Sequence, residues 1–142
     1  TGSNAFNYYR ALFGSYTNYT NKILTMLHFE LSEFDSPDEK GSGKYMDDPF
    51  LQMLDDARSI AGITFKINSG FRTKSRNESC GGKINSSHLF GYAADIHCTD
   101  SRSRFIIIDA LTKAGFNRIG IGNTFIHVDN DPDKDGNVSW VY

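Results

Sequence analysis

A five-residue segment near the C-terminal end, Phe125-Ile126-His127-Val128-Asp129, strongly limits how this chain can fold. Side chains alternate between the two faces of a β-strand, so Ile126 and Val128 share one face while Phe125, His127 and Asp129 share the other. An apolar face is stable only when it packs against another layer of structure. The segment therefore predicts a strand with one packed face and one face that carries chemistry.

A second short segment, residues 93–98, is also typical of a strand, because Gly91 precedes it and a polar turn follows it. Strand alternation places Ala93, Asp95 and His97 on one face. Ala93 is small and leaves room beside the carboxylate of Asp95. We therefore expect Asp95 to face a pocket or the core.

Helical patterns separate the predicted strands. Asp48 and Pro49 supply an N-cap and a first-turn proline, and Gly62 ends this helix. A second helix is predicted for residues 102–114, with Gly115 directly after it. The predicted inward-facing residues of the two helices are Phe50, Leu51, Leu54, Ala57, Ile60, Phe105, Ile108, Leu111 and Ala114.

Further strands are predicted at residues 63–68, 118–121 and 138–142, and surface loops at residues 32–44 and 73–87. Because helices and short strands interleave, the sequence predicts an α+β fold. The length of 142 residues suits one domain. We expect an N-terminal arm or linker at residues 1–28, in which residues 1–5 resemble a vector scar, and one folded domain at residues 29–142.

Composition excludes several classes of protein. Fifteen Lys and Arg against seventeen Asp and Glu give a formal net charge of -2, so the chain lacks the basic excess that nucleic-acid binding requires. No apolar run approaches the roughly 20 residues of a membrane span. The two cysteines, Cys80 and Cys98, fit either one disulfide or two free thiols.

The chain has four histidines, at positions 28, 88, 97 and 127. Gly91 lies between His88 and Asp95 and lets the chain turn so that both side chains face one point. Two imidazoles and a carboxylate, here His88, Asp95 and His127, are a common ligand set for catalytic zinc. Spacing alone gives more weight to ordinary structural roles for these three residues, with His97 as an alternative ligand.

Five motifs occur in order along the chain. Ser69-Gly70-Phe71-Arg72 and Gly81-Gly82 come first, then the segment from Ser87 to Ile96, which together with Ser86 has the pattern Ser-x-His-x-x-Gly-x-Ala-x-Asp, then Gly115 to Gly122, and finally Phe125 to Asp129. Together they closely resemble the zinc D-alanyl-D-alanine carboxypeptidase family, which is related to the hedgehog zinc domain. The resemblance covers about residues 29–142 and implies a small, mostly antiparallel sheet packed with helices.

The resemblance also implies roles for single residues. It makes His88, Asp95 and His127 zinc ligands and Arg72 the group that binds substrate or polarises its carbonyl; a solvated loop cation is the alternative for Arg72. Ser87 is a candidate substrate-binding residue or a residue that orients a ligand. The substrates implied are peptidoglycan stem peptides, and the setting is a cell envelope, a periplasm or a phage lysin.

The sequence departs from this family pattern at the expected proton acceptor. Many relatives carry an acidic residue three positions before the last zinc histidine, where this chain has Thr124, and others carry a histidine where it has Phe125. Asp129 is the candidate general base because it shares a strand face with His127. A structural carboxylate bonded to a neighbouring loop is the alternative for Asp129.

The sequence thus supports two functional hypotheses. The first is a zinc peptidase that cleaves stem peptides at a D-amino-acid bond, either as a D-Ala-D-Ala carboxypeptidase or as a lysin-type endopeptidase. The second is a zinc-bearing cell-wall-binding or structural module with little or no catalysis. The presence of Thr124 in place of an acidic residue supports this second hypothesis. A calcium loop at residues 131–135 is a weaker interpretation, because an acidic turn between two strands explains the same residues.

Overall fold

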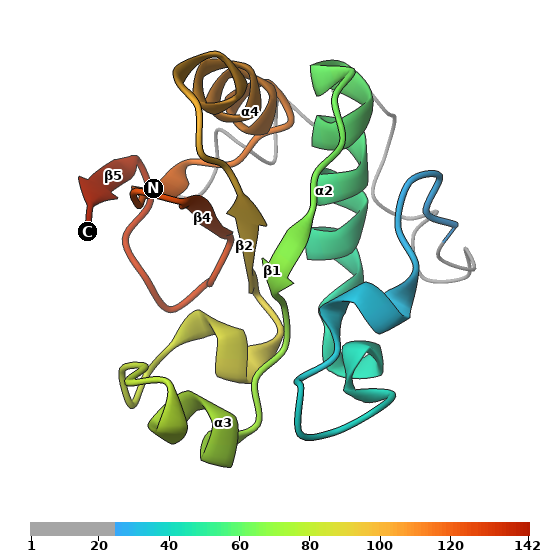
Figure 1. Cartoon of the computed structure of the whole chain (residues 1–142), viewed down its shortest axis with the longest axis vertical. Coiled ribbons are helices and arrows are strands. Elements are labelled where there is room, and N and C mark those ends of the chain that lie inside the picture. The colour runs from blue at the N-terminus through green and yellow to red at the C-terminus, as the bar shows by residue number, and fades with distance from the viewer. Residues whose placement is uncertain (1–24) are drawn as a thin grey trace.

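The computed structural model describes residues 25–142, which form an α+β fold around a five-stranded sheet (Figure 1). The strand order is β1-β2-β4-β3-β5, and every neighbouring pair is antiparallel except β3 and β5. The predicted α+β fold with a small, mostly antiparallel sheet is therefore confirmed. The strands are β1 (Ile67–Ser69), β2 (Ala93–His97), β3 (Arg118–Ile121), β4 (Phe125–Asp129) and β5 (Val138–Val141).

Two long helices and several short ones surround the sheet. In Figure 1, α2 runs along the right-hand side, α4 lies at the top and α3 lies at the opposite end. The α-helices are α2 (Asp48–Ala61), α3 (Lys74–Ser79) and α4 (Ser101–Lys113), and the short 3-10 helices are η2 (Leu31–Phe34), η3 (Ser42–Tyr45) and η4 (Ser87–Phe90). None of the helices within residues 25–142 has the length and apolar character that a membrane span requires.

One face of the sheet packs against α2 and α4. Ile96, Ile126 and Val128 are fully buried on this face, and they belong to the same apolar cluster as the buried residues of both helices. Burial of this surface is the main stabilising contribution to the fold. The alternation predicted for residues 125–129 is thus confirmed, and the opposite face of β2 and β4 carries Asp95 and His127.

Helix α2 forms as predicted, but its first residue differs. The N-cap is Asp47, whose carboxylate accepts a hydrogen bond from the backbone N–H of Phe50, so the N-cap predicted at Asp48 is wrong. Asp48 instead begins the first turn, where a negative charge is favourable beside the helix N-terminus. Gly62 ends the helix in the left-handed conformation, with a φ of 66°. Ile60 was predicted to face inward, but it is 48 % exposed and lies outside the core.

Helix α4 packs against the core with most of the residues that its spacing predicted, but not with the first of them, Phe105. Phe105 is 73 % exposed, while Ile107, Ala110 and Leu111 are buried. Three consecutive isoleucines at residues 106–108 make two helix faces equally apolar, so periodicity does not choose between them. The predicted burial of Leu111 and Ala114 is confirmed.

Most of the predicted strand at residues 63–68 lies outside the sheet, and only Ile67–Ser69 forms strand β1. The Lys66 carbonyl still accepts a hydrogen bond from the backbone N–H of His97 on β2. Phe65 is nevertheless buried. The register to β2 is irregular between Ile67 and Ser69, which limits the pairing to this short stretch. The sequence pattern therefore overestimated the length of this strand.

The predicted loop at residues 73–87 contains a helix, α3. The Thr73 hydroxyl accepts a hydrogen bond from the backbone N–H of Arg76 and so caps the first turn. The six-residue helix ends before Gly81, which has a φ of 74°. A polar surface helix this short has no apolar stripe, so hydrophobic periodicity does not detect it.

Leu27 and His28, next to the predicted domain boundary, bond to helix α2. The backbone N–H groups of Leu27 and His28 each donate to the buried Asp55 carboxylate at 2.9 Å, which ties this segment to α2. Most of the arm or linker predicted at residues 1–28 lies outside the described residues. Cys80 is exposed and Cys98 is buried, and both are free thiols rather than a disulfide.

Candidate metal centre

The strand register lines up one row of residues across the open face of the sheet. Ser69 on β1 pairs with Asp95 on β2, Asp95 pairs with His127 on β4, His127 pairs with Gly120 on β3, and Gly120 pairs with Trp140 on β5. Residues paired in this way point to the same side of the sheet. Two of the three predicted zinc ligands are therefore direct neighbours on adjacent strands.

The third predicted ligand, His88, lies on η4 just before β2. The Ser86 side chain accepts a hydrogen bond from the His88 N–H at the start of η4, and Gly91 ends η4 with a φ of 76°. A side chain at position 91 would collide with the backbone of the Tyr45 segment, so this sharp turn requires glycine. The turn that Gly91 was predicted to make is confirmed, and it brings His88 back over Asp95.

The three side chains converge. Asp95 Oδ1 lies 3.3 Å from His88 Nε2 and 2.9 Å from His127 Nδ1. One ligand atom from each of the three residues lies within 4.8 Å of the others, which is a spacing that a metal ion can bridge. Both imidazoles are buried, and Asp95 is partly buried.

The chemistry of these atoms fits a cation. His88 Nδ1 lies 2.7 Å from the Gly70 carbonyl oxygen and donates to it, which leaves Nε2 with a free lone pair. That Nε2 is buried and has no hydrogen-bond partner, yet it faces a carboxylate oxygen. A lone pair and an anionic oxygen repel one another unless a cation lies between them, so the donor set suits zinc.

The charges around the cluster shift all three pKa values. Burial lowers the pKa of His88 more than the Asp95 carboxylate raises it. Burial also acts to raise the pKa of Asp95, but the hydrogen bond from His127 and the proximity of His88 hold that pKa well below its usual range. For His127, burial disfavours the charged ring, but hydrogen bonds to Asp129 and Asp95 outweigh burial and raise the pKa.

His127 is held from its other side by Asp129, the predicted general base. Asp129 Oδ2 lies 2.8 Å from His127 Nε2, and Asp129 Oδ1 lies 2.6 Å from Arg118 Nε. The carboxylate is only 1 % exposed, and both of its oxygens are engaged. Burial alone would raise its pKa, but the hydrogen bond from His127 and the Arg118 charge lower it. The base role remains a prediction, and these contacts favour orientation of His127.

Arg118 is a residue of this site that the sequence interpretation missed. Its guanidinium pairs with Asp129, donates to the Asp135 carbonyl and lies 5.4 Å from the centre of the Trp140 ring. The available signal was strand alternation on residues 118–121, because it places Arg118 and Gly120 on one face. Strand alternation alone does not show which strand lies beside Arg118. Only the pairing of β3 with β4 shows that this face carries His127.

Arg72 lies beside the cluster, next to β1. Its Nε donates to Ser69 Oγ at 2.9 Å, one terminal nitrogen lies 3.4 Å from Asn77 Oδ1, and the other donates to Asp95 Oδ2 at 3.0 Å. The guanidinium is therefore held in place rather than solvated as a free loop cation. Its substrate-binding role remains a prediction.

Ser87, the other predicted substrate-binding residue, bonds to the loop between β4 and β5. Its hydroxyl donates to Asp131 Oδ2 at 2.7 Å and accepts from Lys134 Nζ at 2.8 Å. The Lys134 ammonium also lies 3.7 Å from Asp131 Oδ2, so a cationic side chain pairs with the first carboxylate of this acidic turn. This arrangement matches the acidic turn that was preferred over a calcium loop.

The remaining positions of interest lie away from the metal ligands. Thr124 is exposed in the turn before β4, and its carbonyl oxygen accepts a hydrogen bond from the backbone N–H of Cys98. The Phe125 ring packs on Tyr142 with a centroid distance of 5.0 Å. His97 is exposed and is not part of the cluster among the described residues.

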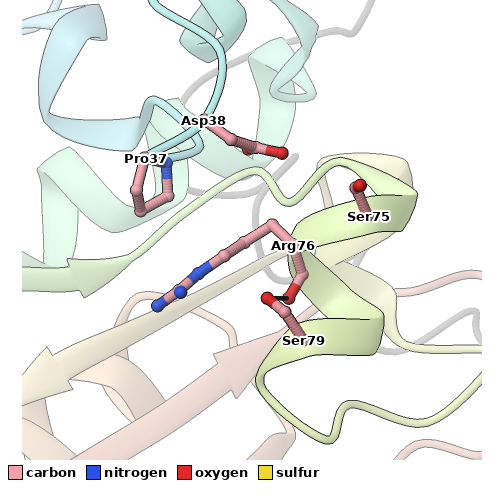
Figure 2. A pocket seen from close by; sticks show the side chains of 5 residues that line it. All are labelled: Pro37, Asp38, Ser75, Arg76 and Ser79. Carbon is pink, nitrogen blue, oxygen red and sulfur yellow. Dashed lines mark hydrogen bonds between the residues drawn. The ribbon is translucent and has the colours of Figure 1, made fainter.

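A shallow pocket occurs elsewhere, between α3 and the loop that connects η2 to η3. Figure 2 shows that Pro37, Asp38, Ser75, Arg76 and Ser79 line this pocket, with the Arg76 side chain extending from α3 across it. None of the three candidate ligands lines it. The pocket is therefore separate from the candidate metal centre.

Comparison with known proteins agrees with this geometry. The family described as Peptidase M15 matches residues 27–129, a range that contains His88, Asp95 and His127 together with Arg72. No curated protein matches the chain at a significant level. The family match spans more than half of the chain and includes the whole cluster. We therefore identify the chain as a member of the Peptidase M15 family, the zinc-dependent peptidases of the D-Ala-D-Ala carboxypeptidase type.

Proposed function

We propose that this chain hydrolyses peptidoglycan stem peptides at a bond next to a D-amino acid, as a D-Ala-D-Ala carboxypeptidase or as a lysin-type endopeptidase. Membership of the Peptidase M15 family supports a zinc peptidase that acts on cell-wall peptides. One structural observation carries the proposal. The buried, unpaired Nε2 of His88 faces Asp95 Oδ1, which also contacts His127 Nδ1.

His88 Nε2, an oxygen of Asp95 and His127 Nδ1 would hold the metal. Zinc bound there would polarise the scissile carbonyl and bring the pKa of a bound water to about 7. The Gly70 carbonyl fixes the ring of His88 by accepting from Nδ1, so that Nε2 is the free donor atom. Asp95 is already ionised because its pKa is lowered, which suits a ligand.

Asp129 acts in this proposal through His127. Its carboxylate accepts from Nε2 of the ring, so Nδ1 is the nitrogen left for the metal, and Arg118 fixes the carboxylate in turn. Hydrogen bonds of this kind orient a ligating imidazole and increase its basicity. Asp129 is therefore a positioning residue in our proposal.

Arg72 is the proposed substrate-binding cation. Three of its contacts fix the guanidinium beside Asp95, and a guanidinium carries five N–H groups, so donors remain for a substrate. A peptide carboxylate or a carbonyl oxygen that gains charge during hydrolysis is the natural acceptor for such a group. A terminal carboxylate at this position would favour carboxypeptidase action, and a carbonyl would favour endopeptidase action.

The test is hydrolysis of a synthetic stem pentapeptide, followed by mass spectrometry. Release of terminal D-alanine indicates a carboxypeptidase, and internal fragments indicate an endopeptidase. We expect a chelator to abolish cleavage and added zinc to restore it. His88→Ala and His127→Ala should be inactive, while His97→Ala, an exposed histidine outside the cluster, should retain activity.

Zinc binding together with cell-wall binding but without cleavage would favour the second hypothesis, a binding or structural module. The observation behind that hypothesis is Thr124, which is exposed and takes the place of the acid that many relatives carry. Cleavage that resists chelation would contradict both hypotheses.

A further inference from the structure

The last strand of the sheet places two aromatic rings beside the candidate metal centre. Trp140 on β5 and Tyr142 directly after it alternate with Val141, so the two rings share one side of the strand. The Trp140 ring centroid lies 5.6 Å from that of His127, and 6.3 Å from that of Tyr142. Val141 lies on the other side and is 77 % exposed.

The closeness of Trp140 and His127 is unexpected from their positions in the sheet. They lie on strands that are separated by β3, so their backbones are about 9.6 Å apart. The rings are much closer than this, so the indole leans across β3 toward the imidazole. The Trp140 ring also contacts the Arg118 guanidinium, which lies 5.4 Å from the ring centroid.

Gly120 makes this lean possible. It is the β3 residue between His127 and Trp140 in the cross-strand row, and it has no side chain to separate them. A Cβ at this position would lie 2.7 Å from two atoms of the Trp140 ring and 2.8 Å from Tyr142 Cε2. Alanine at position 120 would therefore push both rings away from the site.

Tyr142 extends the aromatic surface from Trp140 toward Phe125, with a ring centroid distance of 5.0 Å to Phe125. Partial burial raises the pKa of its hydroxyl, a hydrogen bond with Trp140 opposes the rise, and the carboxylates of Asp95 and Asp129 add to it. Those charges act on the phenol only because it lies near the site. A phenol is protonated at neutral pH, so this hydroxyl can donate to a ligand.

The open face of the sheet thus has a polar end and an aromatic end. Arg72 is bonded to Ser69 and Asp95 at the β1 end of the cross-strand row, and Trp140 lies at the β5 end, with His127 between them. A ligand that spans this row meets a cation at one end and aromatic faces at the other. The family match ends at residue 129, so the aromatic end lies outside it.

We propose that Trp140 and Tyr142 form a substrate-binding wall that contacts the small apolar side chain of a substrate residue, such as the methyl group of alanine, while the polar end of the same substrate points toward Arg72. This inference rests on the proposed function, because it assigns the orientation of the substrate in that site. Aromatic faces bind alkyl groups by removing apolar surface from water. Trp140 and Tyr142 are specificity-determining residues, and Gly120 is a positioning residue.

The test compares two residues of β5 that face opposite sides. Kinetics of stem-pentapeptide hydrolysis are measured for the wild type, Trp140→Ala, Tyr142→Ala and the control Val141→Ala. We expect Trp140→Ala to raise KM roughly tenfold with zinc content unchanged, because the contact binds the substrate in ground and transition states alike. Val141→Ala should match the wild type.

A second readout does not require turnover. Trp140 is the only tryptophan of the chain, so intrinsic fluorescence reports directly on this site. We expect the pentapeptide to change the fluorescence of the zinc-loaded wild type and of Val141→Ala. In Gly120→Ala the displaced ring should give a smaller change and a higher KM. If Trp140→Ala does not fold, Tyr142→Ala at the exposed end of the chain makes the same comparison.

The outcomes separate this inference from the proposed function. If the wild type cleaves and Trp140→Ala and Tyr142→Ala keep the wild-type KM, the wall is refuted and the function stands. If the wild type does not cleave, the proposed function fails, and calorimetric binding of the same peptide decides on the wall. Weaker peptide binding by Trp140→Ala than by Val141→Ala then supports the wall. Equal binding by these two variants, or no binding by the wild type, overturns it.

Discussion

Replacing Asp129 with asparagine separates orientation of a metal ligand from general-base catalysis. Asp129 uses one carboxylate oxygen for His127 Nε2, at 2.8 Å, and the other for Arg118 Nε, at 2.6 Å. Asparagine has a single acceptor oxygen and an NH₂ group that cannot accept, so Asp129→Asn keeps the shape but can satisfy only one of these two donors. The imidazole of His127 then loses part of its orientation and basicity.

The expected magnitude follows from the role of such carboxylates in metal sites. Loss of a partner that orients a ligating histidine weakens metal binding about 10-fold to 100-fold, which corresponds to about 1.4 to 2.7 kcal/mol. We expect a shift of this size in the zinc dissociation constant of Asp129→Asn. Asp133→Asn, which changes an exposed carboxylate of the adjacent loop, should leave zinc affinity at the wild-type value.

The assay is competition for zinc against a chromophoric chelator at fixed neutral pH, with kcat for pentapeptide hydrolysis measured on the fully zinc-loaded proteins. A positioning role predicts weaker zinc binding that excess zinc largely compensates. Wild-type zinc affinity together with a kcat that excess zinc does not restore would refute this reasoning and return Asp129 to the role of general base.

Three further predictions concern the fold. Asp47→Ala should lower the free energy of unfolding by about 1 kcal/mol in urea denaturation and Asp48→Ala by much less, because only Asp47 caps α2; equal losses would contradict the assigned cap. Leu54→Ala, at a fully buried site, should cost about 2 to 5 kcal/mol, while Ile60→Ala, at a site 48 % exposed, should cost less than about 1 kcal/mol. Backbone N–H groups donating to Asp35 hold its pKa below the ordinary 3.8, so its stabilising contribution is present above that pH and is lost as the pH falls through the lower folded-state pKa. Denaturation as a function of pH should therefore show that the deficit of Asp35→Ala shrinks in acid, and a deficit that grows in acid would contradict this.

The ligand triad was within reach of the sequence because its signals are local. Alternation in residues 93–98 and 125–129 gives the faces of two strands, and Gly91 supplies the turn that brings His88 back over Asp95. The motif order then identifies the family. Each motif is local, but only the order of the motifs along residues 69–129 favoured a metal site over ordinary structural roles.

The errors arise where local patterns are ambiguous. Three isoleucines in a row left the buried face of α4 undetermined, and Phe105 was placed in the core although it is mostly exposed. Helix α3 has no apolar stripe, and its capping hydroxyl, Thr73, resembles any other loop threonine. In such segments tertiary contacts determine which residues are buried and which form a helix. Hydrophobic spacing carries no information about those contacts.

The missed residues depend on contacts between distant strands. Arg118 pairs with Asp129, and Trp140 reaches His127 across Gly120, only because β3 lies between β4 and β5 in the sheet. The pairing of β3 with β5 is parallel, which the succession of short strands late in the chain did not suggest. Strand order is a non-local property, so the pattern of each strand alone cannot provide it.

The metal content of the purified protein tests the central claim most directly. Wild type, His88→Ala, His127→Ala and His97→Ala are equilibrated with zinc, dialysed and measured by elemental analysis. A single zinc ion per chain in the wild type and in His97→Ala, and none in the other two variants, is the result that this account predicts. No zinc in the wild type, or equal zinc in all four proteins, would contradict it.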